Sequence, residues 1–142
     1  MNNLSCFTVD DEQGAIETLS VLLHRYCPFL TIAGTAGSVA EALVFLKDTV
    51  VDILFLDIKM KQETGFDLLR QLPERGAHVI FVTAHDQYGI QAIKFSATDY
   101  LLKPVNPEEL IAAVHKVGQK KINHTDQVAM LLQSYQQQQN NT

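Results

Sequence analysis

In the stretch DILFLDIKM, residues 52–60, a short apolar run ends at an aspartate, Asp57. Residues 52–56 are nearly continuous in apolar side chains, as expected for a parallel strand that is covered on both faces. Residues 78–83, HVIFVT, have the same character. An unpaired carboxylate is expensive to bury, so an aspartate that directly follows such a strand needs a partner. We therefore predict two central parallel strands, the first of which ends at Asp57 beside a compensating charge.

Short β-rich runs alternate with helical patterns along most of the chain. Strands are predicted at 4–9, 31–36, 52–56, 78–83 and 99–103, and helices at 12–26, 39–48, 65–72, 88–95 and 107–120. This alternation predicts an α/β fold, a doubly wound five-stranded parallel sheet with helices on both faces. The second strand ends without a group comparable to Asp57, which suits an edge position. The strand order 2-1-3-4-5 then places the first and third strands side by side at the switch point.

Local signals mark where several helices begin. Ser38 and Glu41 have the spacing of a capping box, and Asn106 before Pro107 has that of an N-cap followed by proline in the first turn. Apolar residues at helical spacing predict the buried faces of the first helix (Ile16, Leu19, Leu22, Leu23, Tyr26) and of the last (Leu110, Ile111, Val114, Val117).

The bulk composition excludes several classes of protein. The chain has 142 residues, of which 46% are apolar and 19% charged, as in one soluble globular domain. Its net charge of -5 argues against a general nucleic-acid-binding surface. Neither a signal peptide nor an apolar run long enough for a membrane span is present, so we expect a cytoplasmic protein. Cys6 and Cys27 lack metal-site spacing and are predicted to be reduced structural thiols.

Charged and polar residues follow the predicted strands. The strand ends carry Asp10 and Asp11, Asp57, Thr83 and Lys103. Because the carboxyl ends of parallel strands meet at one edge of the sheet, we expect these side chains to share that edge. Clustered carboxylates repel each other, and a hard cation such as Mg²⁺ relieves the repulsion while it leaves positions open for phosphate oxygens.

Phosphoryl chemistry suits this set of residues. A carboxylate can act as a nucleophile and form an aspartyl phosphate, and Asp57 is the candidate because it stands alone after a central strand. Lys103 supplies a mobile positive charge for a phosphoryl oxygen, and Thr83 supplies a hydroxyl donor.

These motifs, taken in order, resemble the receiver domain of two-component response regulators. The resemblance covers residues 3–120, so we expect a receiver domain at 1–120 and a linker or tail at 121–142, with the output domain absent from this chain. The stretch at 81–105 is similar to regulators that carry a LytTR-type DNA-binding output domain. The motifs that carry the resemblance are VDDE (9–12), FLDIKM (55–60), Gly65, FVTA (81–84) and DYLLKP (99–104).

The resemblance implies a role for each acid. Asp57 would accept a phosphoryl group from a phosphohistidine on a sensor histidine kinase. Asp11 would bind Mg²⁺ directly, Asp10 directly or through water, and the backbone carbonyl of Lys59 would complete the protein ligands, with Mn²⁺ as an alternative ion. The protein would be a signalling switch rather than an enzyme, since it would catalyse only its own phosphoryl transfer and dephosphorylation.

It also implies how the switch works. Lys103 would pair with the phosphoryl group, the Lys103–Pro104 bond would be cis, Thr83 would move to hydrogen-bond the phosphoryl group, and Tyr100 would turn inward with it. The surface around the fourth helix, fifth strand and fifth helix would then favour a homodimer. DNA would be bound only through the absent output domain. From its position in a strand alone, Tyr100 is equally well interpreted as a core residue.

One departure and several alternatives bear on this interpretation. The family usually has proline where this chain has Lys61, although the spacing from Asp57 to Gly65 is kept. An aspartate-nucleophile phosphatase would carry a second acid where Lys59 stands. A nucleotide-binding Rossmann protein would need a glycine-rich loop after a strand, and none is present. A degenerate receiver would lack site residues. A stand-alone receiver acting in a phosphorelay or as an interaction module is the main alternative to a transcription regulator.

Overall fold

The computed structural model describes residues 3–72 and 76–119. Within them, every predicted element is present with bounds within two residues of the expected ones. The predicted tail, 121–142, lies outside the described residues. The strands are β1 (Leu4–Val9), β2 (Leu30–Ala36), β3 (Ile53–Leu56), β4 (His78–Thr83) and β5 (Asp99–Leu102). The helices are α1 (Gln13–Tyr26), α2 (Val39–Leu46), α3 (Gly65–Arg70), α4 (Gly89–Lys94) and a last helix, whose described residues are 107–119.

The sheet has the predicted topology. Its five strands run in the order β2-β1-β3-β4-β5, and every neighbouring pair is parallel. The register pairs Val9 of β1 with Leu56 of β3, so Asp10 and Asp57 are the next residues on adjacent strands. In β4 and β5, Thr83 pairs with Leu102, which precedes Lys103. The register therefore brings the strand ends that carry polar side chains to one edge.

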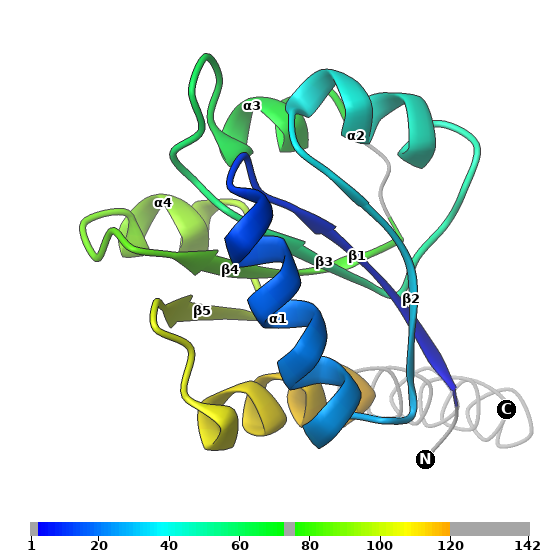
Figure 1. Cartoon of the computed structure of the whole chain (residues 1–142). Coiled ribbons are helices and arrows are strands. Elements are labelled where there is room, and N and C mark those ends of the chain that lie inside the picture. Colours follow the sequence, from blue (N-terminus) through cyan, green and yellow to red (C-terminus); the bar gives the residue numbers. More distant parts are fainter. Residues whose placement is uncertain (1–2, 73–75, 120–142) are drawn as a thin grey trace, which may run out of the picture.

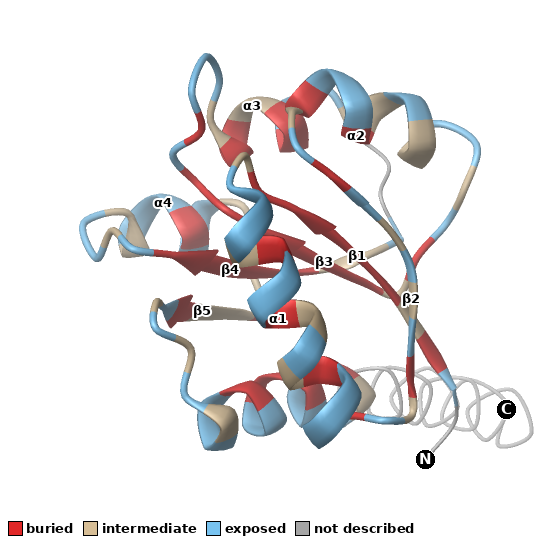
Figure 2. Cartoon of the chain, in the orientation of Figure 1, coloured by how far each residue is buried: buried red, intermediate tan, exposed pale blue. Residues whose placement is uncertain are grey.

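Alternation along the strands divides the core into two layers (Figures 1 and 2). The face covered by α2, α3 and α4 is called the α4 face; β1, β3 and β4 contribute Phe7, Val9, Leu54, Leu56, Val79 and Phe81 to it. The face covered by α1 and the last helix is called the α1 face; the same strands contribute Leu4, Cys6, Ile53, Phe55, Ile80 and Val82 to it. Both sides of the central strands are thus buried, as their apolar composition predicted.

An aromatic cluster fills the α4 face near the polar edge. The ring centroid of Phe66 lies 5.2 Å from that of Phe81, 5.1 Å from that of Phe95 and 6.2 Å from that of Tyr88. The Tyr100 ring lies 6.1 Å from Phe81. These five side chains, here called the aromatic cluster, connect α3 and α4 to the sheet through tilted and stacked ring contacts.

The helix caps agree with the sequence in part. Asn106 accepts hydrogen bonds from the backbone N–H groups of Glu108 and Glu109, as predicted. Ser38 accepts from the backbone N–H of Glu41, but the Glu41 carboxylate accepts from Gly37 rather than from Ser38, so the expected capping box is only half formed. A reciprocal box is present instead at the start of α3, between Thr64 and Asp67.

Two residues expected on buried helix faces are exposed. Tyr26 occupies the last turn of α1, where the Arg25 guanidinium lies over its ring at 5.6 Å. In the last helix, Ala113 is buried and Ile111 is exposed. Helical spacing marks a broad apolar stripe, whereas the sheet covers only its centre. Both predictions were therefore wrong at the edges of the stripe.

The two cysteines are buried free thiols of the α1 face. Burial, with a further contribution from Cys27, raises the pKa of Cys6 to about 12. Both features agree with the predicted structural role, because a neutral buried thiol packs as a small apolar group. Within residues 3–72 and 76–119, none of the helices has the length and apolarity needed to cross a bilayer.

Candidate functional site

Three carboxylates meet where β1 and β3 end. Asp10, Asp11 and Asp57 each offer an oxygen atom, and these atoms lie within 4.8 Å of one another. Asp10 is only 4% exposed and Asp57 only 6%. The N–H of Glu12 donates to Asp10 Oδ1 at 2.9 Å and orients that carboxylate. Crowded and largely buried carboxylates of this kind form an oxygen-rich site suited to a hard divalent cation.

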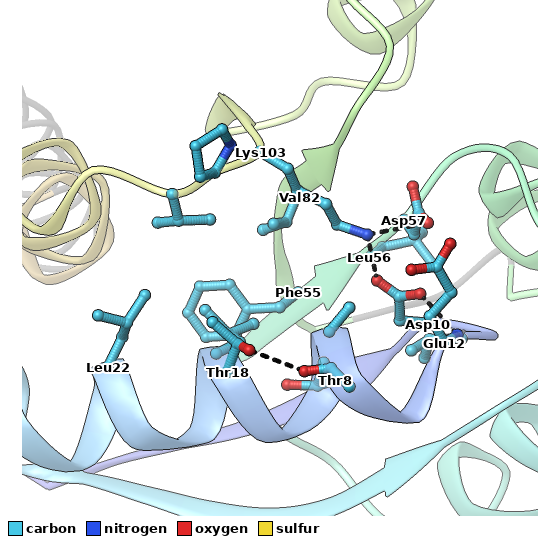
Figure 3. Close-up of a pocket in the computed structure, with 16 residues that line it drawn as sticks. Thr8, Asp10, Glu12, Thr18, Leu22, Phe55, Leu56, Asp57, Val82 and Lys103 are labelled. Carbon is cyan, nitrogen blue, oxygen red and sulfur yellow. Dashed lines mark hydrogen bonds and ion pairs between the residues drawn. The ribbon is translucent and has the colours of Figure 1, made fainter.

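Lys103 lies against two of these acids (Figure 3). Its Nζ is 2.7 Å from Asp10 Oδ2 and 3.4 Å from Asp57 Oδ2. Burial by itself would lower the pKa of Lys103, but the hydrogen bonds and negative charges of Asp10 and Asp57 outweigh burial and raise it. The ammonium therefore stays charged at neutral pH. The peptide bond between Lys103 and Pro104 is cis, as the resemblance implied.

The surroundings of Asp57 favour its protonated form more than water does for a free aspartate. Burial raises the pKa of Asp57, and the charge of Asp10 raises it further. Lys103 and hydrogen bonds from the Thr83 hydroxyl and the Ile58 N–H act in the opposite direction without cancelling the rise. An additional cation would lower the pKa of Asp57 and so favour the ionised carboxylate, which is the nucleophilic form.

Thr83 and Tyr100 are joined through the backbone of one residue between β4 and α4. The Thr83 hydroxyl, which also bonds Asp57, accepts from the N–H of His85 at 3.3 Å. The Tyr100 hydroxyl donates to the carbonyl oxygen of His85. Tyr100 thus belongs to the aromatic cluster and to a polar chain that ends at Asp57. The sequence did not identify the His85 backbone, because a backbone group carries no residue-specific signal.

The loop between β3 and α3 is closed by its own backbone. Lys59 and Thr64 form an antiparallel bridge, and the Met60 N–H donates to the Glu63 carbonyl at 3.2 Å. The Met60 side chain is buried and anchors the loop to the α4 face, while Lys61 at its tip is exposed. The loop projects beyond the sheet edge (Figure 1). Backbone hydrogen bonds and the Met60 anchor therefore shape it without the proline that the family usually has.

The first turn of α3 fixes the end of this loop. Asp67 Oδ2 accepts from the Thr64 N–H at 2.8 Å, and the Thr64 hydroxyl accepts from the Asp67 N–H at 3.3 Å. A Cβ atom at Gly65 would overlap the Asp57 carbonyl oxygen and crowd Leu56, so this position requires glycine. The spacing of threonine and aspartate could have revealed this capping box from the sequence.

A groove runs from the acids along the α1 face (Figure 3). Its volume is about 410 Å³, and the charged side chains of its lining lie at one end. It is called the α1 groove, and its apolar walls come from α1 (Ala15, Leu19, Leu22), the sheet (Phe55, Val82) and the segment after β5 (Pro104, Val105). Sequence reasoning missed it, since these residues come from four separate segments.

Known proteins share both the sequence pattern and the fold. The sequence is 40% identical over 114 residues to the sensory transduction protein LytT of Enterococcus faecalis, covering 79% of this chain and 47% of that protein. It is 42% identical to an uncharacterised response regulatory protein of Vibrio parahaemolyticus, covering 81% of this chain and 48% of that protein. The chain therefore spans about half the length of the curated relatives it matches.

Solved structures and a family profile also match response regulator receiver domains. The response regulatory domain of mrkE from Klebsiella pneumoniae superposes with a TM-score of 0.75 at 27% identity, over 82% of this chain and 97% of that one. The REC domain of AraT, a response regulator from Geobacillus stearothermophilus, superposes with a TM-score of 0.75 at 28% identity, over 87% and 98%. The sequence profile of the response regulator receiver domain matches residues 6–115. This chain therefore belongs to the response regulator receiver domain family.

Proposed function

We propose that Asp57 is the phosphoacceptor of this receiver and that it takes its phosphoryl group from a phosphohistidine of a sensor histidine kinase. The observation that carries the proposal is the setting of Asp57, which is 6% exposed, within 4.8 Å of the other acids and 3.4 Å from the Lys103 ammonium. A purely structural aspartate would not need such an arrangement of charges.

The transfer is a displacement at phosphorus. A carboxylate oxygen of Asp57 forms the new P–O bond, and the bond from phosphorus to the donor nitrogen breaks, with its electron pair leaving on the donor. Lys103 and Thr83 stabilise the charge on the phosphoryl oxygens. Because Thr83 and Lys103 already contact Asp57, the site is organised before the donor arrives. The protein acts on itself only, which makes it a switch rather than an enzyme with a separate substrate.

Mg²⁺ fits the acids of this site, with Mn²⁺ as an alternative. Asp10, Asp11 and Asp57 would hold it together with the backbone carbonyl of Lys59, and its charge would oppose the rise in the pKa of Asp57 that burial and Asp10 cause. The ion would neutralise charge on the phosphoryl oxygens. The response regulator TrrA of Thermotoga maritima, solved in complex with Mg²⁺ and BeF, supports this assignment at 28% identity, with a TM-score of 0.70 over 82% of this chain and 99% of that one.

The response to phosphorylation would pass through Thr83. A phosphoryl group on Asp57 would compete for the Thr83 hydroxyl, and Thr83 is linked through the His85 backbone to Tyr100. The outer surface of α4 exposes Ile90 and Ile93, which are 75% and 76% accessible. We infer that phosphorylation shifts this surface, with β5 and the last helix, towards a homodimer.

The output is proposed to be transcription through a LytTR-type DNA-binding domain. Support comes from the relatives, which include the transcriptional regulatory protein BtsR of Salmonella typhi at 36% identity, covering 80% of this chain and 47% of that protein. Relatives about twice as long as this chain leave room for a second domain, on the order of 100 residues. Reading the gene beyond Thr142 tests this part directly.

Phosphorylation is tested by intact mass spectrometry. The protein is incubated with acetyl phosphate and Mg²⁺, and we expect a gain of one phosphoryl group that disappears when the metal is chelated. Asp57→Asn should abolish the gain, whereas Asp48→Asn, at an exposed acid after α2, should leave it unchanged. An unmodified wild-type protein, or equal modification of Asp57→Asn, would contradict the proposal.

Dimerisation is tested separately by light scattering with and without beryllofluoride and Mg²⁺. The wild type should gain mass towards a dimer, and Ile93→Lys should stay monomeric because a lysine replaces an exposed apolar contact. An Ile93→Lys variant that still dimerises would remove α4 from the interface.

A further inference from the structure

The α1 groove has two ends of different chemistry. Its charged groups, Asp10, Glu12, Asp57 and Lys103, lie together at the phosphoacceptor end (Figure 3). The rest of the groove is walled mainly by apolar side chains, and the Thr18 hydroxyl beside it is already bonded to the carbonyl of Gly14 at 2.8 Å. Three carboxylates and one ammonium leave that end net negative, so an anionic head is matched there only with the Mg²⁺ proposed above held by the acids. With that ion, the ligand that matches the lining has an anionic head and a short apolar tail.

The volume is large enough for such a tail. At about 410 Å³ the groove falls within the range of small-molecule sites, which is roughly 300 to 1,000 Å³. Phe55 and Val82 are buried and close the floor of the groove, and the half-buried Ala15, Leu22 and Val105 offer its accessible apolar surface.

We propose that the α1 groove binds the acyl chain of a short-chain acyl phosphate, so that this receiver accepts a phosphoryl group from acyl phosphates and prefers those longer than acetyl phosphate. The proposal rests on the proposed function of Asp57. The phosphoryl group lies at Asp57 and Lys103, and the acyl chain lies against Ala15, Phe55 and Val105.

The reaction is balanced without a further reagent. An oxygen of Asp57 forms a bond to phosphorus, the bond between phosphorus and the acyl oxygen breaks, and the electron pair leaves on the carboxylate of the free acid. Each added methylene changes only the tail and not the reacting atoms. A gain in rate with chain length therefore reports burial of the tail in the groove.

The first experiment compares acetyl, propionyl and butyryl phosphate as donors to the wild-type protein with Mg²⁺, with modification measured by intact mass over time. Burial of each methylene predicts a rise of about threefold to fourfold in the second-order rate constant. Ala15→Leu places a larger side chain in the groove wall and should remove this gain, so that the three donors react at similar rates. Ala40→Leu, at an exposed alanine of α2, is the matched control and should keep it.

A second measurement needs no reaction. Butylphosphonate and methylphosphonate are titrated into the protein with Mg²⁺ while backbone amide shifts are recorded. Butylphosphonate should shift the amides of Ala15 and Val105, and methylphosphonate should shift only those around Asp57.

The outcomes separate this inference from the proposed function. If no donor modifies the wild type, the phosphoacceptor assignment fails and the inference fails with it. If acetyl phosphate modifies Asp57 and the longer donors are no faster, only the inference is overturned. A chain-length preference that persists in Ala15→Leu would likewise overturn the assignment of the tail to the α1 groove.

Discussion

The two faces of the sheet differ in how densely they are packed next to the polar edge. On the α4 face the aromatic cluster fills the space beneath Thr83, with Phe66 in contact with the rings of Phe81, Tyr88 and Phe95. On the α1 face the α1 groove leaves about 410 Å³ open beside Asp57. One side of the site is therefore solid protein, and the other is accessible to a ligand.

The alternation of side chains along the strands explains this division. Asp10, Asp57 and Lys103 line the α1 groove, on the same face as Phe55 and Leu101 of the strands that precede them. Tyr100 packs on the opposite face. The groups proposed for the chemistry thus lie on the open side and the responding aromatic ring lies on the packed side. In the proposed switch, a change at Asp57 would reach α4 through close-packed rings, which transmit small displacements better than an open groove would.

Truncating a large side chain on each face should give the largest difference in the free energy of unfolding. Phe66→Ala removes the centre of the aromatic cluster and is expected to lower the free energy of unfolding by about 3 to 5 kcal/mol. Leu22→Ala, at a half-buried wall of the α1 groove, should cost only about 1 kcal/mol, because part of that side chain is already in water. Urea denaturation measures both, and equal losses would contradict the contrast between the faces. If the alanine variant does not fold, Phe66→Leu replaces it in the comparison, with a smaller expected loss in the free energy of unfolding.

Two glycines provide the next contrast. Gly65→Ala should destabilise the protein by about 2 kcal/mol or more, since its Cβ atom would meet the Asp57 carbonyl oxygen. Gly14→Ala, where nothing lies within 4 Å, should be neutral or stabilising by up to about 1 kcal/mol. Thermal unfolding of the two variants tests this, and a tolerant Gly65 would mean that the β3–α3 loop yields more easily than its hydrogen bonds suggest.

The raised pKa of Asp57 predicts that removing the charge of this carboxylate stabilises the folded protein, by an amount that depends on pH. Burial and the Asp10 charge raise the pKa of Asp57, so the folded state holds the proton more tightly than the unfolded state does. Ionisation therefore costs stability, and this cost is absent below the ordinary carboxyl pKa and fully present above the raised one. Without metal at pH 7, Asp57→Asn should be more stable than the wild type by about 1 kcal/mol.

That difference should shrink as the pH falls to about 3, below the ordinary carboxyl pKa of about 3.9, where the wild-type carboxyl group is mostly protonated in both states. Added Mg²⁺ should stabilise the wild type more than Asp57→Asn. Urea denaturation at the two pH values measures the effect, and a destabilised Asp57→Asn at neutral pH would show that Lys103 already compensates the charge.

The smallest expected effect lies at the end of α4 on the packed face. Ser96 has φ of 59°, and the N–H of Ala97 donates to the Ala92 carbonyl at 3.1 Å, as in a Schellman motif. Because a side chain is disfavoured in this left-handed conformation, Ser96→Gly should stabilise the protein by up to about 1 kcal/mol. Ser20→Gly, inside α1, is the matched control and should destabilise it by about half as much. A destabilised Ser96→Gly variant would contradict this account of the helix end.

Local patterns sufficed for the elements and for the edge where the site lies. Hydrophobic period distinguishes strands from helices, and Asn106 marks a helix start through its own side chain. The strand order and the meeting of Asp10, Asp57 and Lys103 followed because parallel strands connected in the right-handed sense end at the same edge. None of these inferences needed a distance between side chains.

The same patterns did not predict which hydrogen bond a capping side chain makes, or which residues at the edge of a helical stripe are buried. The spacing at Ser38 and Glu41 is compatible with a full capping box, yet the Glu41 carboxylate binds the Gly37 N–H. Tyr26 has the helical spacing of a core residue but lies beyond the part of α1 that the sheet covers. In both cases the residue types and their spacing are compatible with either arrangement and do not decide between them.

The sequence by itself determined the parallel sheet, its strand order and the residues that gather at its polar edge, because these depend on period, on strand-end residues and on chain connectivity. Only the tertiary structure decided the closed β3–α3 loop, the link from Thr83 to Tyr100 through the His85 backbone, and the α1 groove. Those features depend on backbone groups and on the space between segments that are distant in sequence. The identity of a single residue specifies neither of them.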